Sequence, residues 1–389
     1  MNNNPNLPRK FDAILGGSVP PPFEGVVLGG LEGVKSRLKS TVVEARVAAV
    51  CEAINYGEAG LDVVIEALKD AEKQVQLSAS QLLRERGGIK GKQALLDYEE
   101  WLFFTTLQNW KAEEFNPKIG ITEPNSKAYI VNLDHLKLLL QDPKVTEVEA
   151  LICQMSHWGY FVNMGFYTFA EILVDAHQQL TNLKSLFIGD VEEDIYREDR
   201  QQGNCDYNRY RIELGDISLI LDAYPNLEVL QVRGCSESLE CALQSHKHLR
   251  TLIIETGNIT NKSISQIFTL HLPTLEYFEL WLGKANNYYS VSTNKLLPLL
   301  LDNSFPNLTY LGLRNSEYTN DIAMNVAQSP IIERLAVLDL SMGALTDDGA
   351  EALLNCQAIN RLHTLNVSLN RLSPNMIQQL SQLNCRVIA

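Results

Sequence analysis

The chain has 389 residues, of which 45% are hydrophobic, and this is enough to bury a large core. Its net charge of −14 argues against nucleic acid or an anionic membrane surface as a ligand, because phosphate binding needs a basic surface. The sequence has no apolar run of about 18 residues that could span a bilayer and no secretory signal at its start. Its seven cysteines form no Cys-x-x-Cys motif, so we expect a cytoplasmic protein with reduced thiols.

Residues 1–28 are rich in Asn, Pro and Gly, and we expect an extended N-terminal arm without a core of its own. From residue 29 to 98, apolar residues recur at steps of three and four, which predicts amphipathic helices. Shifting this segment by 30 residues aligns Ala45 with Val75 and Gly57 with Gly87. This repeat resembles the short HEAT-like repeats of bacterial proteins, among them the phycobilin lyases. The resemblance implies about two helix-pair repeats.

Residues 99–147 are predicted to form a connecting and capping segment after the helices. Four aromatic residues cluster near its start, at Trp101, Phe103, Phe104 and Trp110. Terminal units of a solenoid need atypical caps, and we expect these aromatics to cover such an end, although a docking surface remains an alternative. A strand is predicted at 128–131 and a helix at 133–140.

A Leu-x-x-Leu-x-Leu phrase dominates the remainder of the chain, residues 148–389. The phrases begin at Val148, Leu183, Leu227, Leu249, Leu275, Leu308, Leu335 and Leu362. From Leu227 onward they lie 22 to 33 residues apart, and helical stretches separate them. This pattern resembles the ribonuclease-inhibitor subtype of leucine-rich repeats, and it implies an α/β horseshoe solenoid with a concave parallel sheet and convex helices. With its helical N-terminal part, the array resembles bacterial proteins that combine HEAT-like and leucine-rich repeats, a group without an assigned biochemical activity.

The ninth position of each repeat departs from the family pattern. Family members often place Asn or Cys there, where the side chain binds backbone groups in the turn, and Asn370 and Cys235 match. The other repeats carry Gly257, Gly283, Ser316 and Gly343. These turns must therefore satisfy their backbone groups through tight glycine geometry.

The candidate binding residues are found by strand alternation. In each phrase the fourth and sixth residues point into the solenoid, while the third, fifth and seventh point to the concave face. Large and charged residues gather on that face in the middle repeats, at Arg233, Glu255, Tyr277, Glu279, Trp281, Tyr310, Arg314 and Asp339. Trp, Tyr and Arg dominate binding hot spots, so we predict a solvent-exposed, partner-binding patch. The alternative is that Arg233–Glu255 and Glu279–Arg314 are cross-strand pairs and that the aromatics simply cover the sheet.

Catalytic, cofactor and metal motifs are missing from the sequence. The seven histidines form no His-x-x-x-His pair, no Gly-x-Ser-x-Gly elbow is present, and the acidic insertion after Gly189 lacks calcium-loop spacing. We therefore expect a non-enzymatic scaffold that binds a protein partner, with a basic partner surface favoured by the net charge. Two alternatives remain: a chromophore-handling enzyme like the HEAT-repeat lyases, and an inhibitor or immunity partner of a nuclease or toxin.

Overall fold

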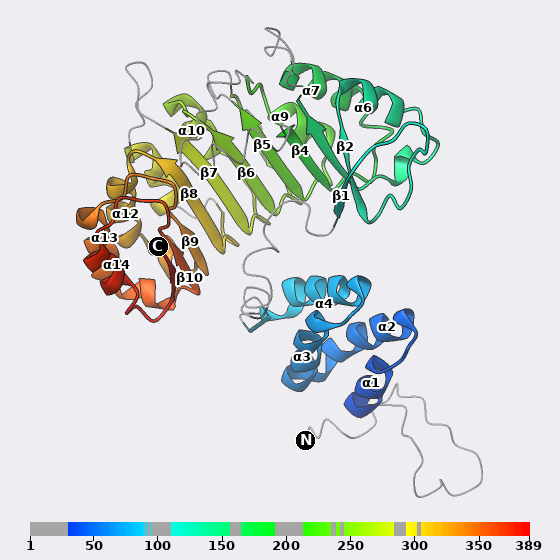
Figure 1. Ribbon diagram of the computed structural model, residues 1–389, viewed down its shortest axis with the longest axis horizontal. Coiled ribbons are helices and arrows are strands. Elements are labelled where there is room, and N and C mark those ends of the chain that lie inside the picture. Colours follow the sequence, from blue (N-terminus) through cyan, green and yellow to red (C-terminus); the bar gives the residue numbers. More distant parts are fainter. Residues whose placement is uncertain are drawn as a thin grey trace, which may run out of the picture. The chain divides into compact units, whose positions relative to one another are not determined.

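The computed structural model describes residues 30–88, 90–91, 94, 110–155, 165–190, 213–234, 239–241, 245–283, 293–301 and 305–389. The chain divides into two compact units, Met1–Phe103 and Phe104–Ala389. Each unit has its own hydrophobic core. Figure 1 shows the helices of the first unit and the sheet of the second.

The first unit is helical. Its helices are α1 (Gly30–Leu38), α2 (Val43–Ala53), α3 (Gly57–Glu66) and α4 (Lys73–Arg86), with short 3₁₀ turns at Ile54–Tyr56 and Ala67–Lys69. Residues at helical spacing form the core, and Val34, Val50, Val64 and Leu83 are fully buried. An ion pair of 3.1 Å joins Arg46 of α2 to Asp70, which follows the second 3₁₀ turn. The prediction of helices here is confirmed, while the HEAT-like character stays a prediction.

The second unit contains a parallel sheet whose strands follow one another in chain order. Its eleven strands are β1 (Lys111–Glu114), β2 (Lys127–Val131), β3 (Ala150–Gln154), β4 (Ser185–Asp190), β5 (Val229–Gly234), β6 (Thr251–Thr256), β7 (Tyr277–Gly283), β8 (Tyr310–Ser316), β9 (Val337–Asp339), β10 (Thr364–Asn366) and β11 (Arg386–Ile388). Each strand therefore pairs only with its neighbours along the chain, as expected of a solenoid.

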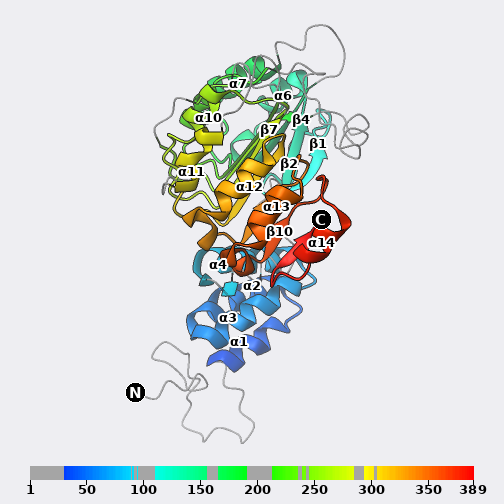
Figure 2. The same cartoon turned by 90° about the vertical axis from the view of Figure 1, so that its left-hand side faces the viewer.

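Helices lie on one face of this sheet, which leaves the other face to the strands (Figures 1 and 2). They are α6 (Leu133–Leu139), α7 (Gly165–Asp175), α9 (Ser218–Ala223), α10 (Asn261–Ile267), α11 (Leu297–Leu301), α12 (Thr319–Ala327), α13 (Asp347–Leu354) and α14 (Pro374–Leu380). Short 3₁₀ turns lie at Val145–Glu147, Thr293–Leu296, Pro330–Glu333 and Gln357–Arg361. The predicted α/β leucine-rich-repeat architecture is confirmed.

The leucines of the repeated phrase form the core between sheet and helices. The residues at the fourth position, all leucine except Phe278, are paired across adjacent strands and are fully buried, from Leu186 through Leu230, Leu252, Phe278, Leu311 and Leu338 to Leu365. One residue per strand thus contributes to a continuous apolar ladder. Full burial of a leucine stabilises a fold by roughly 1.5–3 kcal/mol relative to exposure, so this ladder is a large part of the driving force for stacking.

The sheet begins before the first repeated phrase. Strands β1 and β2 fall within residues 99–147, the segment predicted to connect and cap. Trp110, directly before β1, is buried against Ala150, Ile152 and Phe187, which belong to β3 and β4. Its indole nitrogen donates to the Glu149 carboxylate at 3.2 Å. Trp110 therefore packs on strands near the start of the sheet. Residues 101–109 fall outside the described residues, and the capping role of the aromatics stays a prediction.

The turns at the ninth position of the repeats satisfy their backbone groups in two ways, either through a side chain or through a glycine that lets two backbone segments approach closely. Asn370 donates its amide hydrogens to the carbonyls of Leu340 and Val367, both at 2.9 Å. An earlier repeat has Gly283 at the equivalent place, with a φ of 74°. A Cβ added there would overlap the carbonyl oxygen of Gly257. Close backbone approach therefore replaces the asparagine at this turn, as the sequence predicted.

Candidate partner-binding face

The sheet face opposite the helices, here called the concave face, brings the predicted residues together. Tyr277 on β7 is paired with Tyr310 on β8, and Trp281 is paired with Arg314. The two tyrosine rings stack with their centroids 3.8 Å apart and 14° between their planes. Between them Glu279 faces Gly312, whose missing side chain leaves room for the carboxylate. The phrase predicted that residues at the same position of neighbouring repeats would be paired, and this register is confirmed.

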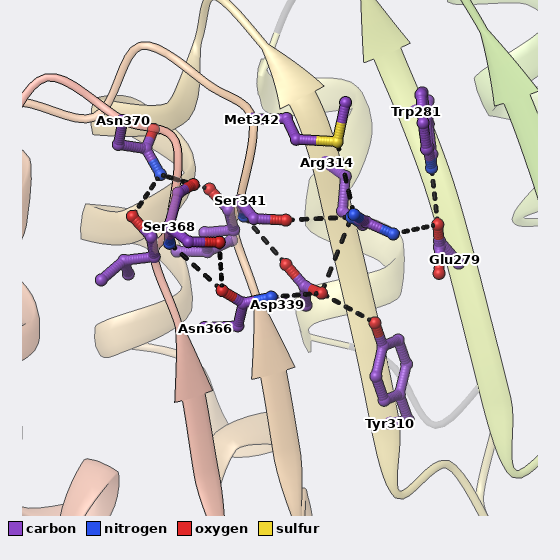
Figure 3. A network of polar contacts seen from close by, with 12 residues as sticks. Glu279, Trp281, Tyr310, Arg314, Asp339, Ser341, Met342, Asn366, Ser368 and Asn370 are labelled. Carbon is purple, nitrogen blue, oxygen red and sulfur yellow. Dashed lines mark hydrogen bonds and ion pairs between the residues drawn. The ribbon is translucent and has the colours of Figure 1, made fainter. Parts of the chain in front are cut away.

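Six residues form what we call the Arg314 cluster, and all of them except Tyr277 are labelled in Figure 3. They are Tyr277, Glu279, Trp281, Tyr310, Arg314 and Asp339. Arg314 donates from Nη1 to Glu279 at 2.7 Å, and its Nε lies 3.6 Å from Asp339 Oδ2. The same Nε donates to the Ser341 hydroxyl at 3.0 Å, and the guanidinium lies 5.2 Å from the Trp281 ring centroid. Two carboxylates and one aromatic face thus hold a single guanidinium.

The polar tips of the aromatic residues bind the same two carboxylates. Trp281 Nε1 donates to Glu279 at 2.6 Å, and the Tyr277 hydroxyl donates to the other oxygen of that carboxylate. Tyr310 donates its hydroxyl to Asp339 at 2.9 Å, and the Asn366 amide donates to the same oxygen at 3.0 Å. Each carboxylate therefore accepts several hydrogen bonds, which offset the cost of removing it from water.

These contacts fix the protonation states of the cluster. Burial alone would lower the pKa of Arg314, but the attraction of Glu279 and Asp339 outweighs it and holds that pKa well above its ordinary value. Burial also raises the pKa of Tyr277 and Tyr310 well above the usual range, and the neighbouring carboxylates raise it further. The guanidinium is consequently charged and both phenols are neutral at physiological pH.

A second group, the Arg233 cluster, lies on strands β4 to β6. Arg233 donates from Nε and Nη2 to the two oxygens of Glu255 at 3.1 and 3.2 Å, and Gln231 donates to the same carboxylate. Asp190 lies 3.8 Å from Arg233 Nη1, and the guanidinium sits 4.8 Å from the Phe187 ring centroid. As in the Arg314 cluster, two carboxylates and an aromatic ring surround one arginine.

The prediction that this patch is solvent-exposed is wrong. Tyr277, Trp281 and Tyr310 are at most 1% exposed, and Glu255, Glu279, Arg233 and Asp339 are also buried. In the Arg314 cluster only the Arg314 side chain keeps partial access, at 22%. The aromatics turn their polar tips to carboxylates on their own and adjacent strands and pack on each other, so little of them faces water. Both cross-strand ion pairs of the alternative interpretation, Arg233–Glu255 and Glu279–Arg314, are present.

Sequence reasoning missed the residues that complete the network, above all Asn366, Ser341 and Gly312. Each occupies a concave position, but none is large or charged, so size and charge gave no signal. A signal was available in the alternation itself. In the phrase that begins at Leu275, the acidic fifth residue Glu279 stands between the aromatic third and seventh residues, Tyr277 and Trp281. That arrangement predicts internal hydrogen bonds as readily as an interface.

The described part of the chain was also compared with the requirements of metal sites, membrane-spanning helices and disulfides. Within the described ranges no three His, Cys, Asp or Glu side chains gather in a way that could hold a metal ion. None of the described helices is both long and apolar enough to cross a membrane. Cys51, Cys153, Cys356 and Cys385 are free thiols, whereas Cys205 and Cys235 lie outside the described residues.

Comparisons with known proteins found solved structures that are similar to the chain. No protein-family model and no curated protein matches the chain. A crystal structure of a Bacteroides fragilis protein is similar at 26% identity and a TM-score of 0.56, covering 68% of this chain and 73% of that one. An internalin of Listeria monocytogenes matches at 14% identity and a TM-score of 0.26, covering 68% and 78% of the two chains. A leucine-rich-repeat protein of Leptospira interrogans matches at 12% and 0.17, covering 72% and 94%.

The last two TM-scores are too low to support an argument, so the assignment rests on the strands themselves. Their parallel register, the chain-order pairing and the buried leucine ladder recur from repeat to repeat. The second unit is therefore a leucine-rich-repeat solenoid.

Proposed function

We propose that the protein is a non-enzymatic scaffold that binds a folded protein partner through the concave face of its leucine-rich-repeat unit. The observation that carries this proposal is the Arg314 cluster, in which an arginine with a partly exposed side chain is held by four fixed groups. An arginine that is already ordered loses little side-chain entropy when a partner contacts it. Arginine is also among the residue types that dominate binding energy at interfaces.

The predicted residues take different roles in this proposal. Arg314 contacts the partner, because its side chain keeps access to solvent. Trp281 positions it by packing against the guanidinium. Glu279 and Asp339 fix its orientation, and Tyr277 and Tyr310 hold these two carboxylates in place through hydrogen bonds. In the Arg233 cluster, Glu255 holds Arg233 in the same way.

Charge favours a basic partner surface. Residues 104–389 contain 21 Lys and Arg against 33 Asp and Glu, so most of the net charge of −14 belongs to this unit. Each of the two arginine clusters also contains two carboxylates for one guanidinium. Electrostatic complementarity speeds encounter more than it tightens binding, and salt screens it. We therefore expect the association rate with the partner to fall steeply as ionic strength rises.

The test is affinity purification from the native host with tagged wild-type protein and two matched variants. Arg314→Lys keeps the charge but removes the planar fork, while Arg361→Lys makes the same change at an exposed residue outside the concave face. A protein recovered with the wild type and with Arg361→Lys, but lost with Arg314→Lys, supports the proposal. Circular dichroism must show that both variants remain folded. Equal recovery with both variants would exclude Arg314 as the contact.

A further inference from the structure

One histidine joins three consecutive repeats. His246 lies in the segment Ser245–Leu249 that leads into β6, and it is 4% exposed. Its backbone N–H donates to the carbonyl of His271, in the segment that leads into β7. Its ring Nε2 lies 3.1 Å from the carbonyl of Tyr224, which precedes β5, and the Leu249 N–H donates to its Nδ1 at 3.0 Å. The side chain therefore links backbone groups that belong to neighbouring repeats.

These partners define the protonation state of the ring. A carbonyl oxygen only accepts, so Nε2 must carry a hydrogen to bind Tyr224. A backbone N–H only donates, so Nδ1 must offer its lone pair to Leu249. Both contacts exist together only in the neutral tautomer with hydrogen on Nε2. Adding a proton places a hydrogen on Nδ1 against the Leu249 N–H, which destroys that hydrogen bond.

The surroundings oppose protonation. Burial lowers the pKa of His246 most, and the nearby His248 lowers it further, while the Tyr224 carbonyl and Asp222 of α9 act in the opposite direction. The remaining titratable or charged residues of the three lead-in segments are Tyr224, Glu228, Lys247, Arg250, His271 and Glu276, of which Arg250 and Glu276 form an ion pair at 3.6 Å. The Tyr224 hydroxyl is engaged elsewhere, because it donates to the carbonyl of Leu173 at 2.6 Å. Among the described neighbours, Asp222 is thus the acidic group that favours the charged ring.

His248 provides a built-in comparison. It is exposed, and its Nδ1 lies 2.9 Å from the carbonyl of Pro225. That carbonyl can accept a hydrogen bond from the ring whether the ring is neutral or charged. Acid therefore leaves the contact of His248 intact but breaks the contact between His246 and Leu249.

We propose that His246 is an acid-sensitive latch, whose protonation frees the segment Ser245–Leu249 and loosens the junction of β5, β6 and β7. In the closed state the ring resists protonation, whereas in the opened or unfolded state it takes up a proton near pH 6.5. The stabilising contribution of the latch is therefore fully present above that pH and is lost as the pH falls below it. Because one proton is taken up, the opening equilibrium rises by at most about tenfold per pH unit.

The experiment is native-state amide hydrogen exchange of the full chain between pH 7.5 and 5.0, corrected for the intrinsic exchange rate. Peptides that cover residues 245–253 should lose protection progressively below pH 6.5 in the wild type. In His246→Asn, the amide oxygen replaces Nδ1 as the acceptor for Leu249 and does not titrate, so protection should no longer depend on pH. The matched control His248→Asn should retain the wild-type pH dependence.

Two results would overturn the latch. One is the same pH dependence in wild type and His246→Asn, and the other is its loss in His248→Asn. If His246→Asn fails to fold, the wild type still decides through NMR titration of the histidine ring protons. The ring of His246 must then titrate below the ordinary histidine pKa of about 6.5, and titration at or above that value rejects the proposal.

Discussion

Removing the guanidinium of Arg314 is the most informative perturbation of the concave face. In Arg314→Leu, Glu279 and Asp339 keep their hydrogen bonds to Trp281 and Tyr310 but lose the cation between them. Both carboxylates are almost fully buried, at 4% and 2% exposure. The substitution therefore leaves two like charges close together in a site with little water.

The expected cost is set by these contacts. Breaking a buried ion pair by removing one partner costs about 3–5 kcal/mol. Since the Arg314 side chain is 22% exposed, water can partly replace it, and we expect the lower end, about 3 kcal/mol. For a unit of this size that loss lowers the melting temperature by roughly 5 °C.

The pH dependence identifies the cause of the loss. Burial and mutual repulsion make the two orphaned carboxylates of the variant easier to protonate. The deficit relative to wild type should consequently shrink as the pH falls from 8 to 5, because protonation removes the unpaired charge. Thermal unfolding at a series of pH values, followed by tryptophan fluorescence and calorimetry, measures this difference.

The control is Arg361→Leu, which removes an exposed arginine paired with Glu333. Surface ion pairs contribute about 0–1 kcal/mol, so this variant should differ little from wild type at any pH. A deficit below about 1 kcal/mol in Arg314→Leu, or one that grows in acid, would refute the electrostatic reasoning.

Three further predictions concern the turns and the thiols. Gly283→Ala should lower the free energy of unfolding by at least about 2 kcal/mol, because the positive φ and the overlap with the Gly257 carbonyl leave no room for a Cβ. An unchanged free energy in urea unfolding would contradict this. Asn370→Ala should lower stability by roughly 2 kcal/mol, because buried carbonyls lose their donors, and an unchanged melting temperature would argue against that role. In the native protein the exposed Cys51 should react with a thiol reagent at once. Cys153, whose pKa is raised by burial, should react only after denaturation. Equal reaction rates would contradict the placement of Cys153 in the core.

The repeated phrase predicts most of the second unit because strand alternation is a local property. Strands β5, β6 and β7 begin at Val229, Thr251 and Tyr277, which are the third residues of their phrases. The leucines at every second position all point to one face of the strand, and a shift of the pairing by one residue would expose them. Their burial therefore determines the register. Strand β1, Lys-Ala-Glu-Glu, carries no such pattern. As an edge strand it is mostly exposed, so burial places few constraints on its sequence.

The candidate site is harder to predict because alternation gives a side chain's face and not its exposure. The proximity of Tyr277, Trp281 and Tyr310 was predictable from their positions. Their burial depends on which rotamers bring hydroxyl and indole groups to carboxylates such as Glu279. It also depends on the space at Gly312. The rotamers and the space available depend on contacts between neighbouring strands, and the spacing of residues along the chain does not determine those contacts.

The side-chain network of Figure 3 has a mechanical consequence. It runs from Glu279 on β7 through Arg314 on β8 and Asp339 on β9 to Asn366 on β10. A solenoid held only by neighbouring contacts would peel from its end one repeat at a time under a stretching force. Here the loss of one repeat would leave a buried charge or amide in the next repeat without its partner. The four repeats should therefore rupture together, as a single long step in the force–extension record of a molecule pulled from its C-terminus.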